Sequence, residues 1–302
     1  FIPIMVSILR CAVSRELKAQ ILKCFAAFST VSSVSNIIWR EIETILPRYN
    51  QSGMLSHPKL WQNGIAIEIE EIEVKNEEYP ITIAFLELMN TLFSHLESRM
   101  TIHQMSSSES CFKFIIDSIL LKTSYRIFKN ENEKWIVMKL AYQLLLNIVQ
   151  RCDFIEGLTP RMLAVFSQIL QENLLFRHII SSLEESVTYL EVNYNQPTLK
   201  DYDHGPQQTC RFVEQCTVTI LSLLREVCQR QDLFFESIRG AAGLCLSTFV
   251  KFDSLFNNIN PRTNRQDRLV ILFRMLPFSS EIAIHTLRLL RSLCDANFEM
   301  TY

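Results

Sequence analysis

Hydrophobic residues recur every three or four positions along most of the chain, which is the spacing of one face of an α-helix. Two such stripes are Phe85, Leu88, Met89, Leu92, Phe93 and Leu96, and Val213, Cys216, Ile220, Leu223, Leu224 and Val227. A face of this kind is stable only when a neighbouring helix covers it. The pattern therefore predicts helices that pack against one another.

Two further segments differ in how much of their surface is apolar. Residues 135–149 carry apolar side chains around nearly the whole circumference, which predicts an inner helix covered on two sides. Near the end of the chain, the predicted buried face consists of Ala283, Thr286, Leu287, Leu290, Leu293 and Cys294. Arg288 and Arg291 lie roughly opposite, so we expect an amphipathic helix that covers one side of the stack.

Several helix starts are marked by local chemistry. A Pro at the first helical position loses no hydrogen bond, and an Asn or Ser just before a helix accepts a bond from an otherwise unpaired N–H. A Glu three residues later strengthens the signal. The predicted starts are Tyr79-Pro80, Thr159-Pro160, Asn130 with Glu133, and Ser106 with Glu109.

Residues 65–75 allow two interpretations. Ile65, Ile67 and Ile69 alternate with other residues as in a strand, whereas Ile65, Ile69 and Ile72 share one face of a helix. Glu is disfavoured in strands, and this stretch is rich in Glu. We favour the helix, and the strand stays open as the alternative.

The segments between these patterns are short except at 47–63, 193–208 and 257–266, which are rich in Asn, Pro, Gln, Gly and Asp and predict surface loops. None has the composition of a domain linker, so we predict one continuous segment over residues 1–302. No fixed repeat period is present. The predicted fold class is all-α: an irregular HEAT- or armadillo-like α-helical solenoid, a superhelical stack of antiparallel helix pairs. Because Phe1 is not an initiator Met, we expect a fragment of a longer chain.

Composition and charge narrow the classes of function. The 302 residues include only 6 Gly, which leaves few positions for tight hairpins or phosphate-binding loops. Lys and Arg number 30 against 32 Asp and Glu, so the net charge of −2 lacks the positive excess of a nucleic-acid-binding protein. No apolar stretch predicts a transmembrane helix. The 9 Cys form no Cys-x-x-Cys pair, which favours free thiols in a reducing compartment.

The search for catalytic chemistry finds no motif. Asp201, Asp203 and His204 are candidate cation ligands, but an acidic solvated loop explains them more simply. The segment 240–243, Gly-Ala-Ala-Gly, lacks the Lys and Ser or Thr of a P-loop, so close helix packing is the simpler account. We therefore expect no enzyme, no catalytic residues, no metal site, no cofactor and no small-molecule substrate.

An acidic run also has a simple interpretation. It consists of Glu68, Glu70, Glu71, Glu73, Glu77 and Glu78. Catalytic carboxylate pairs usually come from different elements, whereas a run of this kind is typical of a solvated helix face.

Trp61 is the one candidate partner-binding residue. It lies in a predicted loop where no helix stripe requires a Trp, and Trp is enriched at the energetic centres of interfaces. Packing within the loop is the alternative interpretation.

The stretch from Gly64 to Phe85, GIAIEIEEIEVKNEEYPITIAF, resembles a segment of the large inner-ring scaffold nucleoporins, the 205-kilodalton nucleoporin family. A second similarity is NINPRT at 258–263, ahead of an amphipathic helix, and a third is QRQDLFF at 229–235. The resemblance runs from about Gly64 to the C-terminus. The first sixty residues match that family only in being helical.

This resemblance implies a segment from the N-terminal half of an α-helical superhelix in the nuclear pore complex, at the nuclear envelope. Its expected role is a structural scaffold of the inner ring. It would bind adaptor nucleoporins through their short linear motifs, contact other inner-ring nucleoporins and support nucleocytoplasmic transport, with no direct nucleic acid contact.

Other solenoids remain as alternatives. A HEAT-repeat nuclear transport receptor of the importin type has a similar outline, but the regular acidic ladder of inner helices is missing here. Another solenoid interaction scaffold is also compatible with the helix pattern. A DNA-associated scaffold would need a basic groove, which the net charge of −2 opposes.

Overall fold

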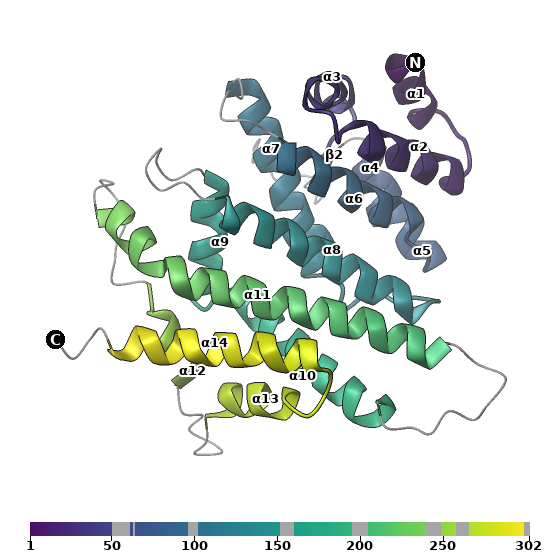
Figure 1. Cartoon of the computed structure of the whole chain (residues 1–302). Helices are drawn as coiled ribbons and strands as arrows, with labels where there is room; N and C mark the ends of the chain where they lie inside the picture. The colour runs from purple at the N-terminus through teal and green to yellow at the C-terminus, as the bar shows by residue number, and fades with distance from the viewer. Residues whose placement is uncertain are drawn as a thin grey trace, which may run out of the picture. The chain divides into compact units, whose positions relative to one another are not determined.

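The computed structural model describes residues 1–49, 61–62, 64–95, 102–151, 160–194, 205–239, 249–257 and 266–298. Helices account for almost all of this part of the chain (Figure 1). The chain divides into two compact units, Phe1–Asn147 and Ile148–Tyr302, which we call unit 1 and unit 2. The predicted fold class, an all-α solenoid of irregular helix pairs, is confirmed. The single continuous segment over residues 1–302 stays a prediction.

Unit 1 is built around the pairing of two helices, α2 and α6. Its elements are α1 (Ile2–Leu9), α2 (Arg15–Phe28), α3 (Ser32–Ile42), β1 (Arg48–Tyr49), β2 (Trp61–Gln62), α4 (Gly64–Ile67), the π-helix η1 (Glu68–Glu73), α5 (Val74–Asn76), α6 (Pro80–His95), α7 (Ile102–Phe114), the π-helix η2 (Ile115–Leu120) and most of α8 (Glu131–Gln150). α2 lies along α6, and α3 also contacts α6 (Figure 1). Leu22 and Phe25 on α2, and Phe85 and Leu88 on α6, are fully buried.

The ambiguous stretch at 65–75 is helical, and the strand alternative is wrong. α4, η1 and α5 follow one another without a break from Gly64 to Asn76. Ile65 and Ile69 are buried as the helical interpretation requires, but Ile72 is 36% exposed and Glu73 is fully buried instead. The reason is the π-helical winding of η1, whose i→i+5 hydrogen bonds widen the turn and bring Glu73 round to the face of Ile69.

The predicted helix starts are confirmed at three of four places. Pro80 and Pro160 are the first residues of α6 and of α9 (Pro160–Leu170). Asn130 precedes α8, and its Oδ1 accepts a hydrogen bond from the N–H of Asn132 at 3.0 Å. The start predicted at Ser106 is wrong, because α7 begins at Ile102. Ser costs little inside a helix, so a capping-box pattern does not require that the helix begin there.

The cap at Asn130 leads to a stability prediction. We expect Asn130→Ala to lower the free energy of unfolding by about 1 kcal/mol, since the N–H of Asn132 loses its acceptor. Urea denaturation followed by circular dichroism measures the change. Lys23→Ala, at an exposed position in the middle of α2, is the control and should change the value by less than about 0.5 kcal/mol. Equal midpoints for the two variants would contradict a stabilising cap.

α8 is the inner helix that the pattern at 135–149 predicts. Trp135, Tyr142 and Leu145 have no exposed surface, and Leu144 beside Leu145 is buried as well. Within unit 1, Asn90 on α6 ties the two helices together, since its Nδ2 donates to the carbonyl oxygen of Leu140 at 2.9 Å. The burial of α8 around most of its circumference is confirmed.

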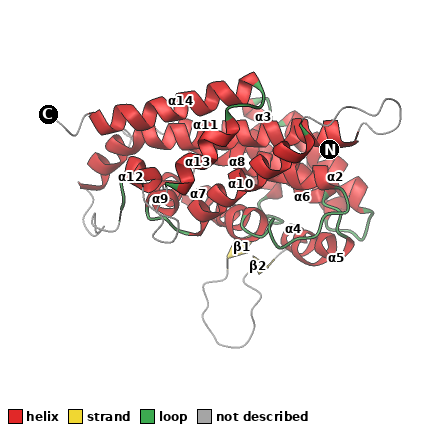
Figure 2. Ribbon diagram, turned by 90° about the horizontal axis from the view of Figure 1, so that it is seen from below, coloured by secondary structure: helices red, strands yellow, loops and turns green. Residues whose placement is uncertain are grey.

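One strand pairing was not predicted. β1 and β2 pair antiparallel, with Arg48 opposite Gln62 and Tyr49 opposite Trp61, inside the predicted loop 47–63 (Figure 2). Each strand has two residues, so the fold class is unchanged. The rest of that loop, and most of the loops predicted at 193–208 and 257–266, lie outside the described residues.

Unit 2 is organised around one long helix, α11. Its elements are the end of α8, α9 (Pro160–Leu170), α10 (Leu174–Asn193), α11 (Gly205–Arg239), α12 (Phe252–Asn257), α13 (Asp267–Met275) and α14 (Ser280–Phe298). α14 and α10 both pack against α11, and Figure 1 shows α14 running beside it. The predicted stripe on α11 is fully confirmed, because all six of its residues are buried. Phe166 on α9 stacks on Phe234 of α11 with ring centroids 4.7 Å apart.

The buried face predicted for the last helix is partly wrong. Thr286 and Leu293 are buried as expected, but Leu287 is 56% exposed and Cys294 is exposed. Ile282 and Leu289 take their places in the core. α14 carries apolar residues over more than one face, so periodicity alone did not decide which face meets its neighbours.

Candidate functional site

Trp61, the candidate partner-binding residue, belongs to β2, where its backbone pairs with Tyr49. Its side chain lies outside the described part of the structure. A role for Trp61 in partner binding therefore stays a prediction.

The acidic run is not a solvated helix face, and that prediction is wrong. Glu68 forms an ion pair with Lys18 of α2. Glu70 forms two ion pairs. Its Oε2 lies 2.5 Å from the ammonium of Lys122, and its Oε1 lies 2.6 Å from the guanidinium of Arg126. Buried or half-buried carboxylates need such partners, because an unpaired charge is costly to desolvate. The run thus ties the 64–76 helix to α2 and to the segment after η2.

Two carboxylates from distant positions cap the start of α6. Glu73 accepts hydrogen bonds from the backbone N–H of Ile81 at 2.5 Å, the N–H of Thr82 at 3.0 Å and the hydroxyl of Thr82 at 2.5 Å. Glu133 of α8 accepts the N–H of Tyr79 at 2.9 Å. Pro80 has no N–H, so the N–H groups of residues 79, 81 and 82 are all satisfied. Negative charge here also complements the helix dipole.

Burial raises the pKa of Glu73 to about 7, although its three hydrogen bonds and Arg126 act in the opposite direction. Burial raises the pKa of Glu133 as well. A perturbed carboxyl is a common mark of a functional site. Here the donors around Glu73 are backbone groups and a hydroxyl of its own fold, so its role is structural.

Tyr79 and Arg126 hold the segment that follows η2 against this cap. The Tyr79 hydroxyl donates to the carbonyl oxygen of Ile127 at 3.0 Å. Arg126 donates to the carbonyl oxygen of Ser118 at 2.6 Å and lies over the Tyr79 ring, 5.6 Å from its centroid. This segment is therefore fixed by polar contacts on both sides.

Removing the hydroxyl tests that anchoring. We expect Tyr79→Phe to cost about 1 kcal/mol of unfolding free energy, since the carbonyl of Ile127 loses its donor while the ring stays packed on Phe128. Amide hydrogen exchange should also speed up at residues 126–129. Tyr125→Phe is a matched control, because the Tyr125 side chain is 87% exposed. Identical exchange in wild type and Tyr79→Phe would contradict the anchoring.

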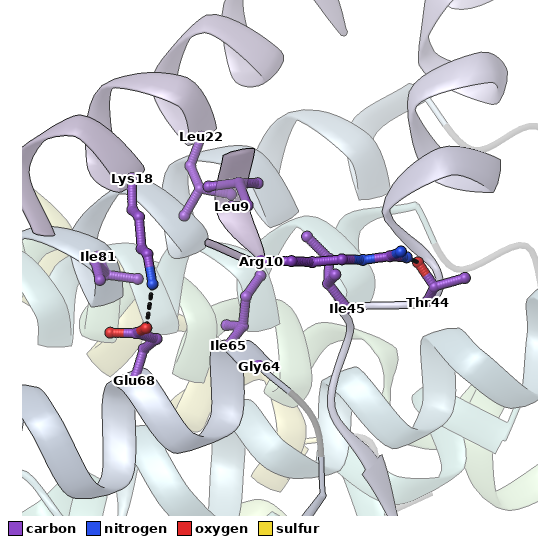
Figure 3. Close-up of a pocket in the computed structure, with 10 residues that line it drawn as sticks. All are labelled: Leu9, Arg10, Lys18, Leu22, Thr44, Ile45, Gly64, Ile65, Glu68 and Ile81. Atoms are coloured by element: carbon purple, nitrogen blue, oxygen red, sulfur yellow. Dashed lines mark hydrogen bonds and ion pairs between the residues drawn. The ribbon is translucent and has the colours of Figure 1, made fainter. Parts of the chain in front are cut away.

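Unit 1 also contains a surface pocket of about 250 Å³ (Figure 3). Its apolar wall comes from five aliphatic side chains on α1, α2, the turn after α3, α4 and α6: Leu9, Leu22, Ile45, Ile65 and Ile81. All five are buried. Two polar pairs lie on opposite sides of this wall: Lys18 with Glu68, and Arg10 with Thr44 (Figure 3).

Gly64 completes the lining of the pocket. A Cβ at this position would meet no atom of the described residues within 4 Å, so the described structure leaves the space beside it open. Sequence reasoning missed the whole pocket. Its residues come from five separate segments between positions 9 and 81, and no local motif marks their meeting point.

The described ranges contain no group of side chains with the arrangement of a metal site and no Ser-His-carboxylate triad. No three side chains of His, Cys, Asp and Glu there are grouped as a metal site requires. The Ser222 hydroxyl lies 3.0 Å from Nδ1 of His285, but no carboxylate in the described part hydrogen-bonds to the other ring nitrogen as in a triad. The earlier candidates at 201–204 and 240–243 lie outside these ranges.

The described cysteines form no disulfide bond. Cys111, Cys216 and Cys228 are buried, whereas Cys11 and Cys24 are among the exposed ones. Burial raises the pKa of Cys228 to about 12, which keeps its thiol protonated and unreactive. Within the ranges that the structure describes, no helix is both long and apolar enough to cross a membrane.

Irregular stacks of helices define the class of α-helical solenoid proteins. The chain belongs to the family of nuclear pore complex scaffold proteins, nucleoporins 186/192/205, whose family model matches residues 1–155. The resemblance found in the sequence is confirmed. The location of that family is the nuclear pore complex, at the nuclear envelope.

Two curated relatives agree with this assignment. The chain is 26% identical to the nuclear pore complex protein Nup205 of Homo sapiens over 322 aligned residues, which cover 98% of the chain and 15% of that protein. It is 26% identical to Nup205 of Drosophila melanogaster over 304 residues, 97% of the chain and 14% of that protein. The chain thus spans about 15% of the length of the human relative.

The comparisons correct the extent of the resemblance. The first sixty residues were expected to match the family only in being helical, but the family model begins at residue 1. α1 is apolar nearly throughout, and α2 and α3 have only the general pattern of a helix, so this part of the sequence contains no distinctive motif of the family.

Proposed function

We propose that the chain is a scaffold segment of the inner ring of the nuclear pore complex, continuous over residues 1–302. In this role it receives short linear motifs of adaptor nucleoporins, contacts other inner-ring nucleoporins and supports nucleocytoplasmic transport through pore architecture. The observation that carries the proposal is the family match over residues 1–155, which coincides with a unit of stacked helices.

The physical properties of the chain support this role. Helix stacks expose grooves and pockets between helices, into which peptides insert apolar side chains. The net charge of −2 gives no general attraction to nucleic acid. The relatives are scaffold nucleoporins rather than enzymes, so catalysis, cofactors and small-molecule substrates are not part of the proposal.

Affinity isolation tests the proposal. The full-length protein is tagged in its own cells, isolated gently, and its companions are identified by mass spectrometry. We expect adaptor nucleoporins and other inner-ring nucleoporins. Recovery of Ran with diverse cargo, released by Ran-GTP, would instead make the protein an importin-like transport receptor and would contradict the proposal.

A further inference from the structure

The pocket in unit 1 is small for a ligand site. Its volume of about 250 Å³ is below the range of about 300–1,000 Å³ that is common for small-molecule sites. Five buried aliphatic side chains form its wall. A wall of this kind favours an apolar group, since polar ligand atoms would lose their hydrogen bonds to water there.

The charges around the pocket favour a ligand that carries a negative charge. The ammonium of Lys18 is compensated by the carboxylate of Glu68. The guanidinium of Arg10 has only the neutral hydroxyl of Thr44 as its partner in the described structure. The lining therefore carries one excess positive charge, from Arg10, which lies on the exposed side. A carboxylate is the natural partner of a free guanidinium edge, which binds it with two parallel hydrogen bonds.

Lys18 adds a donor inside the pocket. The residue is 93% buried, being 7% exposed, and it has one acceptor, Glu68, for the three N–H groups of its ammonium. Figure 3 shows its side chain extending from α2 toward Glu68 along the edge of the apolar wall. A peptide carbonyl that enters the pocket can accept one of the remaining N–H groups.

We propose that this pocket binds a short peptide segment in which an aliphatic side chain fills the space between Leu22 and Ile65 and a neighbouring carboxylate pairs with Arg10. The open space beside Gly64 leaves room for the backbone of that segment. The inference rests on the proposed function, because an adaptor motif is the physiological source of such a segment. It adds the chemistry of the motif and the residues that receive it.

The binding test uses a minimal probe, the dipeptide acetyl-Leu-Asp-amide, titrated into the 302-residue chain with labelled methyl groups. The reporters are the methyl resonances of the pocket wall, namely those of Leu9, Leu22, Ile45, Ile65 and Ile81. We expect saturable shifts of these resonances with a Kd of roughly 1 mM, as is usual for so small a ligand. Acetyl-Ala-Asp-amide should bind about tenfold more weakly or worse, and acetyl-Leu-Asn-amide about two- to fivefold more weakly.

Variants of the chain provide the matched tests. Gly64→Leu should fill the open space and abolish the shifts. A Cβ at this position meets no described atom within 4 Å, so we expect the fold to be kept, and an unchanged circular dichroism spectrum checks this. Arg10→Gln should remove the preference for Asp over Asn in the probe while leaving the preference for Leu. Arg40→Gln is the control for lost charge, since the Arg40 side chain is 72% exposed on α3, outside the pocket.

The possible outcomes distinguish a failure of the pocket inference from a failure of the proposed function. Unmoved wall methyl groups, or equal shifts with the Leu and Ala probes, would overturn the inference. If the wall methyl resonances do not respond to the probe but shift when residues 50–60 are replaced by a Gly-Ser repeat, the pocket is occupied by that segment of the chain itself, and the inference is overturned. Saturable binding of the probe without any adaptor in the affinity isolation would support the pocket and contradict the proposed function.

Discussion

Replacing Leu145 by Asp is expected to destabilise unit 1 by about 4 kcal/mol or more. Leu145 has no exposed surface on α8, so the new carboxylate would be buried without a partner, and its two oxygens would take the places of two methyl groups in an apolar core. Typical domains are stable by only about 5–15 kcal/mol. Most of the stability of unit 1 would therefore be lost.

Urea denaturation followed by circular dichroism measures this loss. Because the chain has two compact units, the transition of unit 1 is expected to move to lower urea and separate from that of unit 2. Leu145→Met keeps the volume and should cost less than about 1.5 kcal/mol. Gln20→Asp, at an exposed position of α2, shows the effect of the charge alone. An unchanged midpoint for Leu145→Asp would refute the inner position of α8.

The inner position of α8 can be predicted from its sequence for a physical reason. Three consecutive leucines, 144–146, cannot all lie on one side of a helix, so their presence requires cover on more than one side. The apolar stripe on α11 also predicted the buried face of that helix correctly, because polar residues fill the opposite face. Pro80 and Pro160 marked helix starts since proline fits only a few backbone positions.

The remaining features depend on contacts between segments that are distant in the sequence. Leu287 fits an apolar stripe on α14, but the packing of α14 places Leu289 in the core instead. The burial of Glu73 follows from the π-helical winding of η1 and from the donors at the start of α6, and neither has a signal in the local pattern. Arg10 and Glu68 meet at one pocket only because five segments converge there.

Glu73 is expected to make the stability of unit 1 depend on pH. Its pKa rises from 4.5 to about 7 on folding, because burial favours the neutral carboxyl, so the folded state holds its proton over a range in which the unfolded state has lost it. The stabilisation is complete below about pH 4.5 and is lost as the pH rises through about 7. The shift corresponds to about 3 kcal/mol between pH 4.5 and pH 8.

The comparison with Glu73→Gln isolates this effect, because other titrating groups contribute equally to both proteins and cancel. Glutamine stays neutral at every pH, but its amide group faces the N–H and hydroxyl of Thr82, so a constant cost of about 1–3 kcal/mol is expected. The stability advantage of the wild type should therefore be largest near pH 4.5 and should shrink by about 3 kcal/mol by pH 8. Denaturation of both proteins at several pH values measures it.

Glu73→Ala removes the acceptor altogether. Three donors at the start of α6, the N–H groups of Ile81 and Thr82 and the Thr82 hydroxyl, would then be buried without a partner, which we expect to cost about 3 kcal/mol or more near pH 4.5. This cost should become smaller toward pH 8, because the wild type loses the contribution of Glu73 there. Glu43→Ala, half-buried after α3, controls for the loss of a carboxylate elsewhere in unit 1. A wild-type advantage over Glu73→Gln that stays constant with pH would show that Glu73 is ionised throughout. In that case the helix dipole and the three donors outweigh the cost of burying its charge.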